Sequence, residues 1–510
     1  MAQRPHIPYP GFCGPGYNCQ PEQAAQGIDR IINGMIQPNE VGTTQDQQAT
    51  MRSRPGYTSY CSPGLGVGRG MFVCNMTIGA SVIADQLCGC AGSKFFTVTA
   101  GVSTVRGDIG SGDFQCIVFP NVQATQVAIL NTSSQELYVW NGTTVSLVTI
   151  PEAFYSMSYL NGFAYAVAGG NRIYQSGLND FTSWNASEVG VRLDAQDFVQ
   201  TLFAADANIW AFGQQTSSPF SIGTDGAGFA LSLMDYATVR NGINAPFSVC
   251  SADVPGDTVT VMMAKSTRGF GQAMVVRPGK FDRISTYAIE IKMQNPLDNT
   301  YGIIGSSFQM QGHSLYSLTG FLNAGQIVYD FTAAAQLGKP CWYEWGSGAN
   351  VSATGEMPSW YASKGVPTYS GVGTGEVYGM RKSDGRIVKM DATVRTDEGT
   401  TFAVRRVGPI LYNLGSRTAI NEFRTNQQVG NGLGSEPVGM KISYDGGLTW
   451  VSAIDGSNSY GYSTPESDGM VRWRNLGQAD QRGMAVDVLW DTGGLVTVNG
   501  GSLQIRQDAP

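Results

Sequence analysis

Histidine and charged residues are scarce in this chain of 510 residues. It has two histidines, His6 and His313, and charged residues make up 14% of the sequence, where about 25% is usual. Catalysis by a Ser-His-Asp or Cys-His arrangement would have to use one of these two imidazoles. His313 lies at the start of an expected strand, which favours a surface or core imidazole over a catalytic one. The motifs H-E-x-x-H, G-x-x-x-x-G-K-[ST] and G-x-S-x-G do not occur.

Runs of basic or of apolar residues are also missing. The nearest approaches to a basic run are Arg405-Arg406 and Arg52-Ser53-Arg54, and the net charge is −7. A protein that grips DNA by its phosphates normally has a basic face, so strong DNA binding is not expected. No stretch approaches 18 uncharged apolar residues, and the first residues contain no apolar signal region. We therefore expect no membrane-spanning segment and no signal peptide.

The nine cysteines do not fall into a metal-binding pattern. Their odd number predicts free thiols in a protein made in a reducing cytoplasm. The pairs Cys88/Cys90 and Cys13/Cys19 are the closest to ligand spacing, but neither has a second pair at the spacing of a zinc site. The prediction is that the chain has no metal site, no cofactor and no catalytic residue.

Glycine, in contrast, is abundant, at 66 of 510 residues. Asn161-Gly162 and Gly169-Gly170 flank an alternating apolar segment, and Asp384-Gly385 divides another. Such pairs supply the positive φ angles of tight hairpin turns. Hairpin units recur about every 40 to 50 residues between residues 70 and 390, as expected for four-stranded blades. The pattern predicts an all-β fold with a β-propeller of six or seven blades, and we favour about six.

The two ends of the chain differ from this middle part. In residues 22–35, Ala24, Ile28, Ile31 and Met35 fall on one helical stripe. This predicts a short helix on an N-terminal arm, docked either on its own propeller or on a neighbouring subunit. After residue 398, longer strand patterns separated by Gly, Ser and Asn predict a C-terminal β-sandwich domain. The predicted domains are an arm over 1–50, a propeller over 51–398 and a sandwich over 399–510.

Residues 443–450, SYDGGLTW, resemble the Asp-box of sialidases. In those proteins the box fastens a hairpin through its Asp and Ser/Thr side chains. A single box outside the propeller predicts a structural hairpin and not a glycosidase. The carboxylates of Asp194, Asp197 and Glu290 are scattered and cannot be paired from one sequence. The glycine clusters at 371–375 and 430–434 are interpreted as turns.

Several tryptophans lie in aromatic clusters, namely Trp184, Trp342, Trp345 and Trp490. Such side chains either stack on bases or sugars or fill the space between blades. We favour the second interpretation.

An ordered series of motifs resembles one protein family. The series comprises NRIYQSGLNDFTSW at 171–184, IWAFG at 209–213, RNGINAPFSV at 240–249, and the segments 268–290 and 312–345. In this order they are similar to the tail-hub or nozzle proteins of short-tailed phages, known as packaged-DNA-stabilisation proteins. The likeness covers roughly residues 50 to 480. Residues 52–56, RSRPG, resemble the segment that leads into the first blade of that family.

This resemblance implies a virion structural protein and not an enzyme. It implies a homo-oligomeric ring, expected to be a hexamer, that extends the channel of the portal-adaptor protein, retains packaged DNA and conducts it during ejection. Further implied partners are tail fibre or spike proteins and the double-stranded genome that passes through the lumen. The expected location is the virion tail, after assembly in the host cytoplasm. Two alternatives stay open: a propeller-type glycan-binding or glycan-hydrolysing phage tail protein, and a propeller scaffold of a cell.

Overall fold

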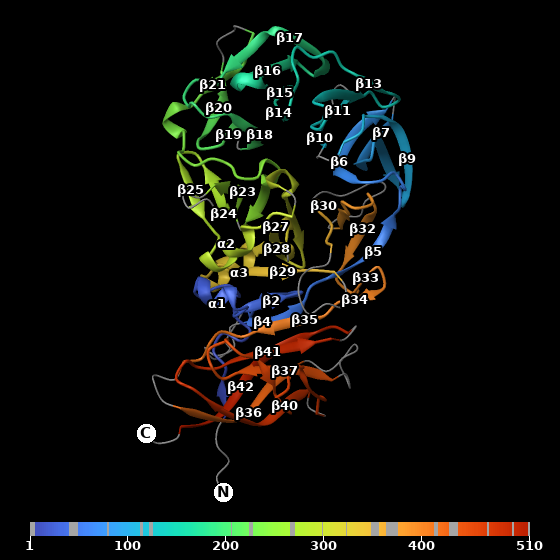
Figure 1. The fold of residues 1–510 in the computed structure, drawn as a ribbon. Coiled ribbons are helices and arrows are strands. Elements are labelled where there is room, and N and C mark those ends of the chain that lie inside the picture. The colour runs from blue at the N-terminus through green and yellow to red at the C-terminus, as the bar shows by residue number, and fades with distance from the viewer. Residues whose placement is uncertain are drawn as a thin grey trace.

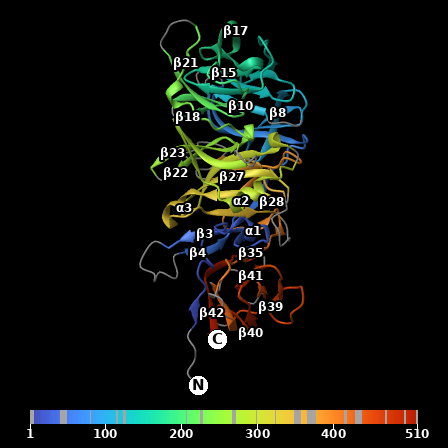
Figure 2. The ribbon, with the colours of Figure 1, turned by 60° about the vertical axis from the view of Figure 1, so that its left-hand side comes forward.

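The computed structural model describes most of the chain. The described residues are 6–39, 49–78, 81–112, 116–121, 126–205, 207–223, 228–254, 256–265, 271–297, 299–322, 324–347, 356–363, 376–412, 417–427, 437–466, 469–491 and 494–507. Small sheets form a ring, and a second β-rich part lies beneath it and holds both ends of the chain (Figure 1). Figure 2, turned by 60°, shows the same two parts one below the other.

The ring contains seven four-stranded blades among the described residues. Five of them are separate sheets: β6 (Gly68–Ile78), β7 (Ser81–Ala91), β8 (Lys94–Thr99) and β9 (Val102–Asp108); β10 (Cys116–Asn121), β11 (Gln126–Asn131), β12 (Glu136–Trp140) and β13 (Val145–Leu147); β14 (Ser156–Leu160), β15 (Phe163–Ala168), β16 (Arg172–Gly177) and β17 (Asp180–Val191); β18 (Val199–Ala205), β19 (Asn208–Gly213), β20 (Ser217–Ile222) and β21 (Leu231–Leu233); β22 (Cys250–Val254), β23 (Asp257–Lys265), β24 (Gly271–Arg277) and β25 (Lys280–Arg283).

The last two blades belong to larger sheets. The sixth comprises β26 (Ile304–Met310), β27 (His313–Phe321), β28 (Ala324–Asp330) and β29 (Trp342–Trp345). The seventh comprises β30 (Trp360–Ser363), β31 (Val377–Met380), β32 (Ile387–Asp391) and β5 (Gly56–Cys61), and is extended by β33 (Thr396–Asp397) and β34 (Thr400–Thr401). Contacts between the first strands of neighbouring blades run from β6 round to β30 and back, except between the fourth and fifth blades, where β18 contacts the 3₁₀ turn η3 (Pro246–Ser248) that precedes β22.

The propeller class is confirmed, with one blade more than the six we favoured. The seventh blade takes β5 from before the first blade and pairs it antiparallel with β32, with Met390 opposite Tyr57. Because its strands come from both ends of the propeller sequence, a count of hairpin units along the chain underestimates the blades.

Apolar clusters fill the spaces between neighbouring blades. Between the first and second blades, the ring of Phe95 lies 5.3 Å from that of Trp140. Between the fourth and fifth, Trp210 and Phe212 pack with Met262 and other side chains of the fifth blade. Burial of such faces is the main stabilising contribution to a ring of small sheets.

Local turn chemistry accounts for the hairpins within blades. Asn161 and Gly162 have φ angles of 50° and 88°, and they connect β14 to β15 with Leu160 opposite Phe163. The Asp384-Gly385 pair lies in the connection from β31 to β32, where Gly385 has a φ of 68°. Both turns lie where the sequence predicts them.

The lower part consists of two sheets, and the N-terminal segment contributes strands to both. One sheet has the order β3-β4-β42-β36-β40, with β1 on β42, and the other runs from β29 through β2, β35, β41 and β37 to β38, with β39 on β37. The strands are β1 (Ile7–Pro8), β2 (Arg30–Ile32), β3 (Gly34–Pro38), β4 (Ala49–Ser53), β35 (Val404–Val407), β36 (Thr418–Gln427), β37 (Val438–Ser443), β38 (Val451–Ser452), β39 (Gly461–Ser463), β40 (Met470–Ala479), β41 (Ala485–Trp490) and β42 (Thr497–Gln507).

The expected helix over residues 22–35 is wrong in length. The helix α1 covers Pro21–Ala25, and the rest of the segment forms β2 and β3. Asp29 and Asn33 have φ angles of 53° and 54°, which interrupt a helix. The apolar residues that suggested a helical stripe are instead buried between sheets, with Ile31 and Ile32 fully buried.

Helices are few among the described residues. Besides α1 they are α2 (Tyr287–Met293), α3 (Phe331–Leu337) and the 3₁₀ turns η1 (Gly169–Asn171), η2 (Asp235–Ala237), η3 (Pro246–Ser248) and η4 (Thr300–Gly302). In the part of the chain that the structure describes, no helix has the length and apolar character needed to cross a membrane.

Candidate functional site at the propeller–sandwich junction

Strand β2 joins the propeller to the lower part of the molecule. It pairs in parallel with β29 of the sixth blade, with Ile32 opposite Glu344, and antiparallel with β35, with Arg30 opposite Val407. A single sheet therefore runs from one part into the other. Rotation of the two parts against each other would break backbone hydrogen bonds, so this geometry favours a rigid connection.

The buried side chain of Arg54 ties together the segments that cross this junction. Its Nη2 lies 2.5 Å from Asp397 Oδ2 and its Nη1 lies 3.0 Å from Asp397 Oδ1. Its Nε donates to Asn33 Oδ1 at 2.9 Å, and Nη1 and Nη2 also donate to the carbonyls of Pro55 and Gly346. All five N–H groups of a guanidinium thus have an acceptor, which is the condition under which a buried charge is tolerated.

The partners of Arg54 come from four places in the chain. Asn33 lies between β2 and β3, and its Nδ2 donates to the carbonyl of Ala403 at 2.9 Å. Gly346 follows β29, and its N–H donates to Asn33 Oδ1 at 2.8 Å. Asp397 belongs to β33, where the chain leaves the propeller, and the Phe402 ring lies 3.8 Å from the Arg54 guanidinium carbon. The Arg54 cluster therefore holds the junction by side-chain bonds, in addition to the β2 pairing.

A second ionic cluster surrounds Glu344. Arg30 donates to both of its carboxylate oxygens, at 2.6 and 2.9 Å, and Lys292 Nζ lies 3.8 Å away. Burial raises the pKa of Glu344 to about 8, and it lowers the pKa of Lys292 to about 7 and that of Arg30 to about 10. The bidentate bonds from Arg30 offset the desolvation of the pair.

The adjacent pair Arg405-Arg406 is also internal to the protein. Arg405 binds Asp487 through Nε at 2.8 Å and Nη2 at 2.7 Å. Arg406 is fully buried and lies 3.0 Å from Asp29 Oδ1, and its Nε donates to the carbonyl of Phe12 at 2.6 Å. Burial raises the pKa of Asp29, and Arg406 opposes that rise. The two arginines that most resembled a basic run are therefore committed to carboxylates of their own chain.

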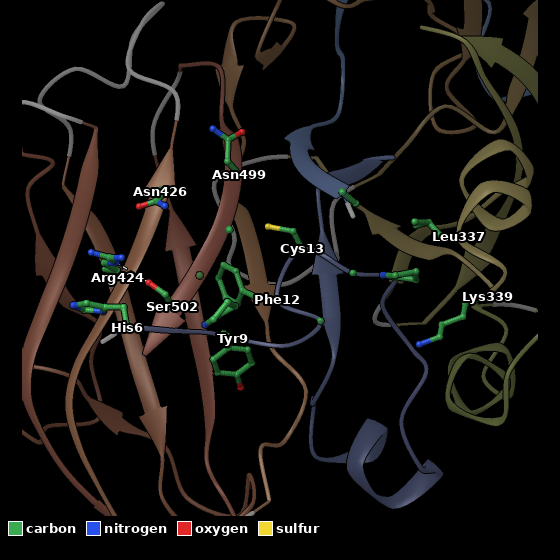
Figure 3. Close-up of a pocket in the computed structure, with 17 residues that line it drawn as sticks. His6, Tyr9, Phe12, Cys13, Leu337, Lys339, Arg424, Asn426, Asn499 and Ser502 are labelled. Carbon is green, nitrogen blue, oxygen red and sulfur yellow. Dashed lines mark hydrogen bonds between the residues drawn. The ribbon is translucent and has the colours of Figure 1, made fainter. Parts of the chain in front are cut away.

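A cavity of about 330 Å³ opens beside the junction. Figure 3 shows Arg424, Asn426 and Ser502 on strands of the lower part with His6 of the N-terminal segment beside them, and Lys339 on the far side beyond Cys13. His6 Nε2 lies 3.5 Å from a carboxylate oxygen of Glu422. Burial and then the charge of Arg424 lower the pKa of His6, while the carboxylate of Glu422 opposes this shift.

The other histidine considered for catalysis is a core residue. His313 is 3% exposed, its Nδ1 lies 2.7 Å from Asp330 Oδ2, and its Nε2 lies 2.9 Å from Gln37 Oε1. Tyr343 also donates to Asp330 Oδ2, at 3.0 Å. Both ring nitrogens are held by structural partners, and this network ties the sixth blade to β3.

The Asp-box is a hairpin fastener, as its sequence predicts. Ser443 Oγ donates to Asp445 Oδ1 at 2.9 Å, and it accepts from the N–H of Gly447 at 2.8 Å. Asp445 also accepts from the N–H and the hydroxyl of Thr449, at 2.9 and 2.6 Å. These bonds close the connection between β37 and β38.

The scattered carboxylates have local structural roles: Asp194 and Asp197 both lie against Arg192, whose Nη2 is 3.6 Å from Asp197 Oδ1, whereas Glu290 pairs with another arginine. Asp194 lies 3.1 Å from Arg192 Nε. Asp197 accepts from the backbone of Gln215 and Thr216, and Glu290 lies 2.7 Å from Arg283 Nε.

The tryptophans and cysteines are mostly interior. Trp342, Trp345 and Trp490 are fully buried, and Trp184 donates its indole N–H to the carbonyl of Phe181 at 2.9 Å. Cys88 and Cys90 are buried, whereas Cys13 and Cys19 are half-buried. Among the described residues, no group of three or more His, Cys, Asp or Glu side chains is placed to hold a metal ion. The glycine clusters at 371–375 and 430–434 lie outside the described residues.

The junction was not found from the sequence. The segment RSRPG at 52–56 has a family likeness, but nothing in it identifies Asp397 as the partner of Arg54, 343 residues away. The sequence signal that could have pointed to this junction is the pair Arg52 and Arg54, followed by Pro-Gly, where the arm meets the blades.

Comparison with known proteins bears on the propeller. A family model described as "Bacteriophage P22 Gp10, beta-propeller" (Phage_stabilise) matches residues 32–394. No curated protein matches the sequence. Three solved structures that are similar are a streptogramin B lyase (9% identity, TM-score 0.41, 66% of this chain and 98% of that chain), the N-terminal domain of Nup159 (11%, 0.37, 69% and 97%) and YCF48 bound to D1 peptide (12%, 0.38, 67% and 99%). At these identities and scores the three structures support no conclusion about function.

Proposed function

The chain belongs to the phage stabilisation family of Bacteriophage P22 Gp10 β-propellers, and has the structural role in the phage tail that this membership supports; from this premise we propose that it is the nozzle, or tail hub, of a short-tailed phage. In this role it forms a ring that extends the portal-adaptor channel, retains packaged DNA and conducts the DNA during ejection. The observation that carries the proposal is the family match, which covers residues 32–394.

The geometry of the described residues supports a rigid wall. Each wedge between neighbouring blades is occupied by apolar side chains, and close-packed interiors deform little. The propeller is joined to the lower part by β2 and by the Arg54 cluster, which are buried and hydrogen-bonded. A tube that contains DNA under pressure needs this kind of connection.

The pairing of the arginines supports a wall that DNA can slide past. Arg30, Arg54, Arg405 and Arg406 each bind a carboxylate of the same chain. A guanidinium that is neutralised internally releases no counterion from a phosphate backbone. With a net charge of −7, we expect a neutral or acidic lumen without a strong DNA-binding patch.

Further parts of the proposal concern assembly and domains. The ring is proposed to be a homohexamer in the virion tail, assembled in the host cytoplasm, in contact with the adaptor and with tail fibre or spike proteins, and without enzymatic activity. The division into an arm over 1–50, a propeller over 51–398 and a sandwich over 399–510 stays a proposal. In that division, strands of the arm complete both sheets of the sandwich.

Electron microscopy of the purified chain, alone and mixed with portal–adaptor complexes, tests the proposal. We expect sixfold rings that attach to the adaptor end of the complex, and no turnover when the chain is incubated with host polysaccharide. A chain that stays monomeric and does not attach to the adaptor would refute the nozzle. Hydrolysis of the polysaccharide would favour a glycan-cleaving tail protein instead.

A further inference from the structure

The cavity at the junction, called the junction cavity below, has a positively charged lining in an acidic protein. Its side chains include Lys339 and Arg424, and no Asp or Glu is among the described residues that line it. Arg424 donates to the hydroxyl of Ser502 at 2.7 Å and to the sulfur of Met470 at 3.8 Å. Neither acceptor carries a charge. The lining therefore suits an anionic ligand.

One edge of β42 is open at this cavity. Strand β1 pairs with β42 as far as Ser502, and Tyr9 N–H donates to the carbonyl of Gly501 at 2.8 Å. Strand β4 pairs with the same strand at Thr497 and Val498. Between them, over Asn499 and Gly500, this edge carries no strand among the described residues, while the opposite edge pairs with β36 through a bulge. An unpaired strand edge is a site where an extended peptide can add.

Two buried polar atoms at the cavity also lack a partner. They are Nδ1 of His6 and Oδ1 of Asn426, and both residues line the cavity. Buried polar atoms are satisfied in the great majority of cases. The N–H groups of an added peptide supply the donor that Asn426 Oδ1 needs, and its N–H or carbonyl groups satisfy His6 Nδ1, according to whether that nitrogen carries the proton.

From these observations we propose that the junction cavity binds a short, extended, acidic peptide segment of a partner chain. The peptide backbone adds to the open edge of β42 at Asn499 and Gly500. Its carboxylates pair with Arg424 on the sandwich side and with Lys339 on the propeller side, so that the bound segment bridges the two parts (Figure 3). The volume, near the lower end of the roughly 300–1,000 Å³ of ligand sites, limits the segment to a few residues. Only the expectation that the partner is a tail protein rests on the proposed function.

Fluorescence anisotropy with labelled peptides tests this site on the full chain. The probe is acetyl-Val-Glu-Val-Asp-Val-amide, and the matched neutral peptide has Gln and Asn in place of Glu and Asp. We expect saturable binding of the acidic peptide that weakens with added salt. Binding of the neutral peptide should be at least about tenfold weaker, since charge-assisted hydrogen bonds are roughly twice as strong as neutral ones.

Two variants locate the binding. A Cβ at Gly500 would meet nothing within 4 Å, so Gly500→Val places a branched side chain in the cavity from a position with room for its Cβ, and Lys339→Glu reverses an exposed charge on the far side of the cavity. Each is expected to weaken the acidic peptide at least about tenfold. Gly169→Val is the matched control, because Gly169 also has free space around a Cβ and lies in the third blade; it should bind as the unmodified chain does.

Several outcomes would overturn the proposal. They are the absence of saturable binding, equal binding of the neutral peptide, wild-type binding by both Gly500→Val and Lys339→Glu, or displacement of the peptide by a 20-base-pair DNA duplex, which would indicate a phosphate site. Self-association of the chain that is blocked by the acidic peptide would identify a second copy as the partner and support the site. A chain that forms rings on the adaptor but binds no peptide would refute this inference alone and leave the nozzle in place.

Discussion

Replacing Arg54 with methionine removes the guanidinium at the centre of the junction while keeping an unbranched side chain over the Phe402 ring. The variant loses hydrogen bonds to Asn33, Pro55, Gly346 and Asp397. The largest loss concerns Asp397, whose side chain is 1% exposed and would remain buried without its cation. Removing one partner of a buried ion pair costs about 3–5 kcal/mol. We expect a loss of this size in the free energy of unfolding, which is a large part of the roughly 5–15 kcal/mol typical of folded proteins.

Urea denaturation followed by tryptophan fluorescence measures this loss, and limited proteolysis locates it at the segments that cross the junction. Arg52→Met is the matched control, because Arg52 lies in β4, two residues before Arg54, is half-buried and forms no ion pair with any described residue. Arg54→Met combined with Asp397→Leu should recover part of the loss, since it leaves no unpaired charge. A loss below about 1 kcal/mol for Arg54→Met would refute the reasoning. So would a double variant that loses more free energy of unfolding than the two single variants lose together.

Two further predictions concern the blades. Trp210→Ala empties the wedge between the fourth and fifth blades, where Trp210 is 1% exposed, and should lower the free energy of unfolding by about 3–5 kcal/mol in the same denaturation assay. The control Tyr236→Ala, at an 83% exposed site, should lower it by almost nothing. Equal losses in the two variants would contradict the stabilising role of the wedge. Asp391 accepts from the hydroxyl and N–H of Thr393, and these bonds lower its pKa. Its stabilisation is therefore complete above the unfolded value near 3.9 and is lost as the pH falls through the lowered folded value. Asp391→Ala should cost about 1 kcal/mol at pH 7 and less below pH 3, and a gap that stays constant between these pH values would disprove the link.

Some interactions of the fold are local in sequence, and these were predictable. The turn at Asn161-Gly162 and the bonds of Asp445 join residues within a few positions of each other. Their geometry depends on the φ angles that Asn and Gly adopt and on short side chains that reach their own backbone. The expectation that the tryptophans fill the wedges holds only in part: Trp184 packs against the cluster between the second and third blades, whereas Trp490 lies in β41 of the lower part.

The N-terminal segment shows where such reasoning ends. Ile28, Ile31 and Met35 satisfy a helical stripe, and they equally satisfy short strands that are buried on both faces. The choice is made by β29 and β35, which lie more than 300 residues away and offer unpaired edges to β2. The seventh blade was undercounted for the same reason, because β5 pairs with a strand from the far end of the propeller.

Composition and turn spacing by themselves determined that the chain is an all-β propeller with little charge to offer to DNA, since both follow from residues close together in sequence. The tertiary structure alone decided which arginines are neutralised, how the propeller is fixed to the sandwich and where a strand edge stays open. The physical reason is that the segment packed against a buried charge or a strand edge determines whether the charge is neutralised and whether the edge is paired. For Arg54, Glu344 and β42 the partners lie in segments that only the folded chain brings together.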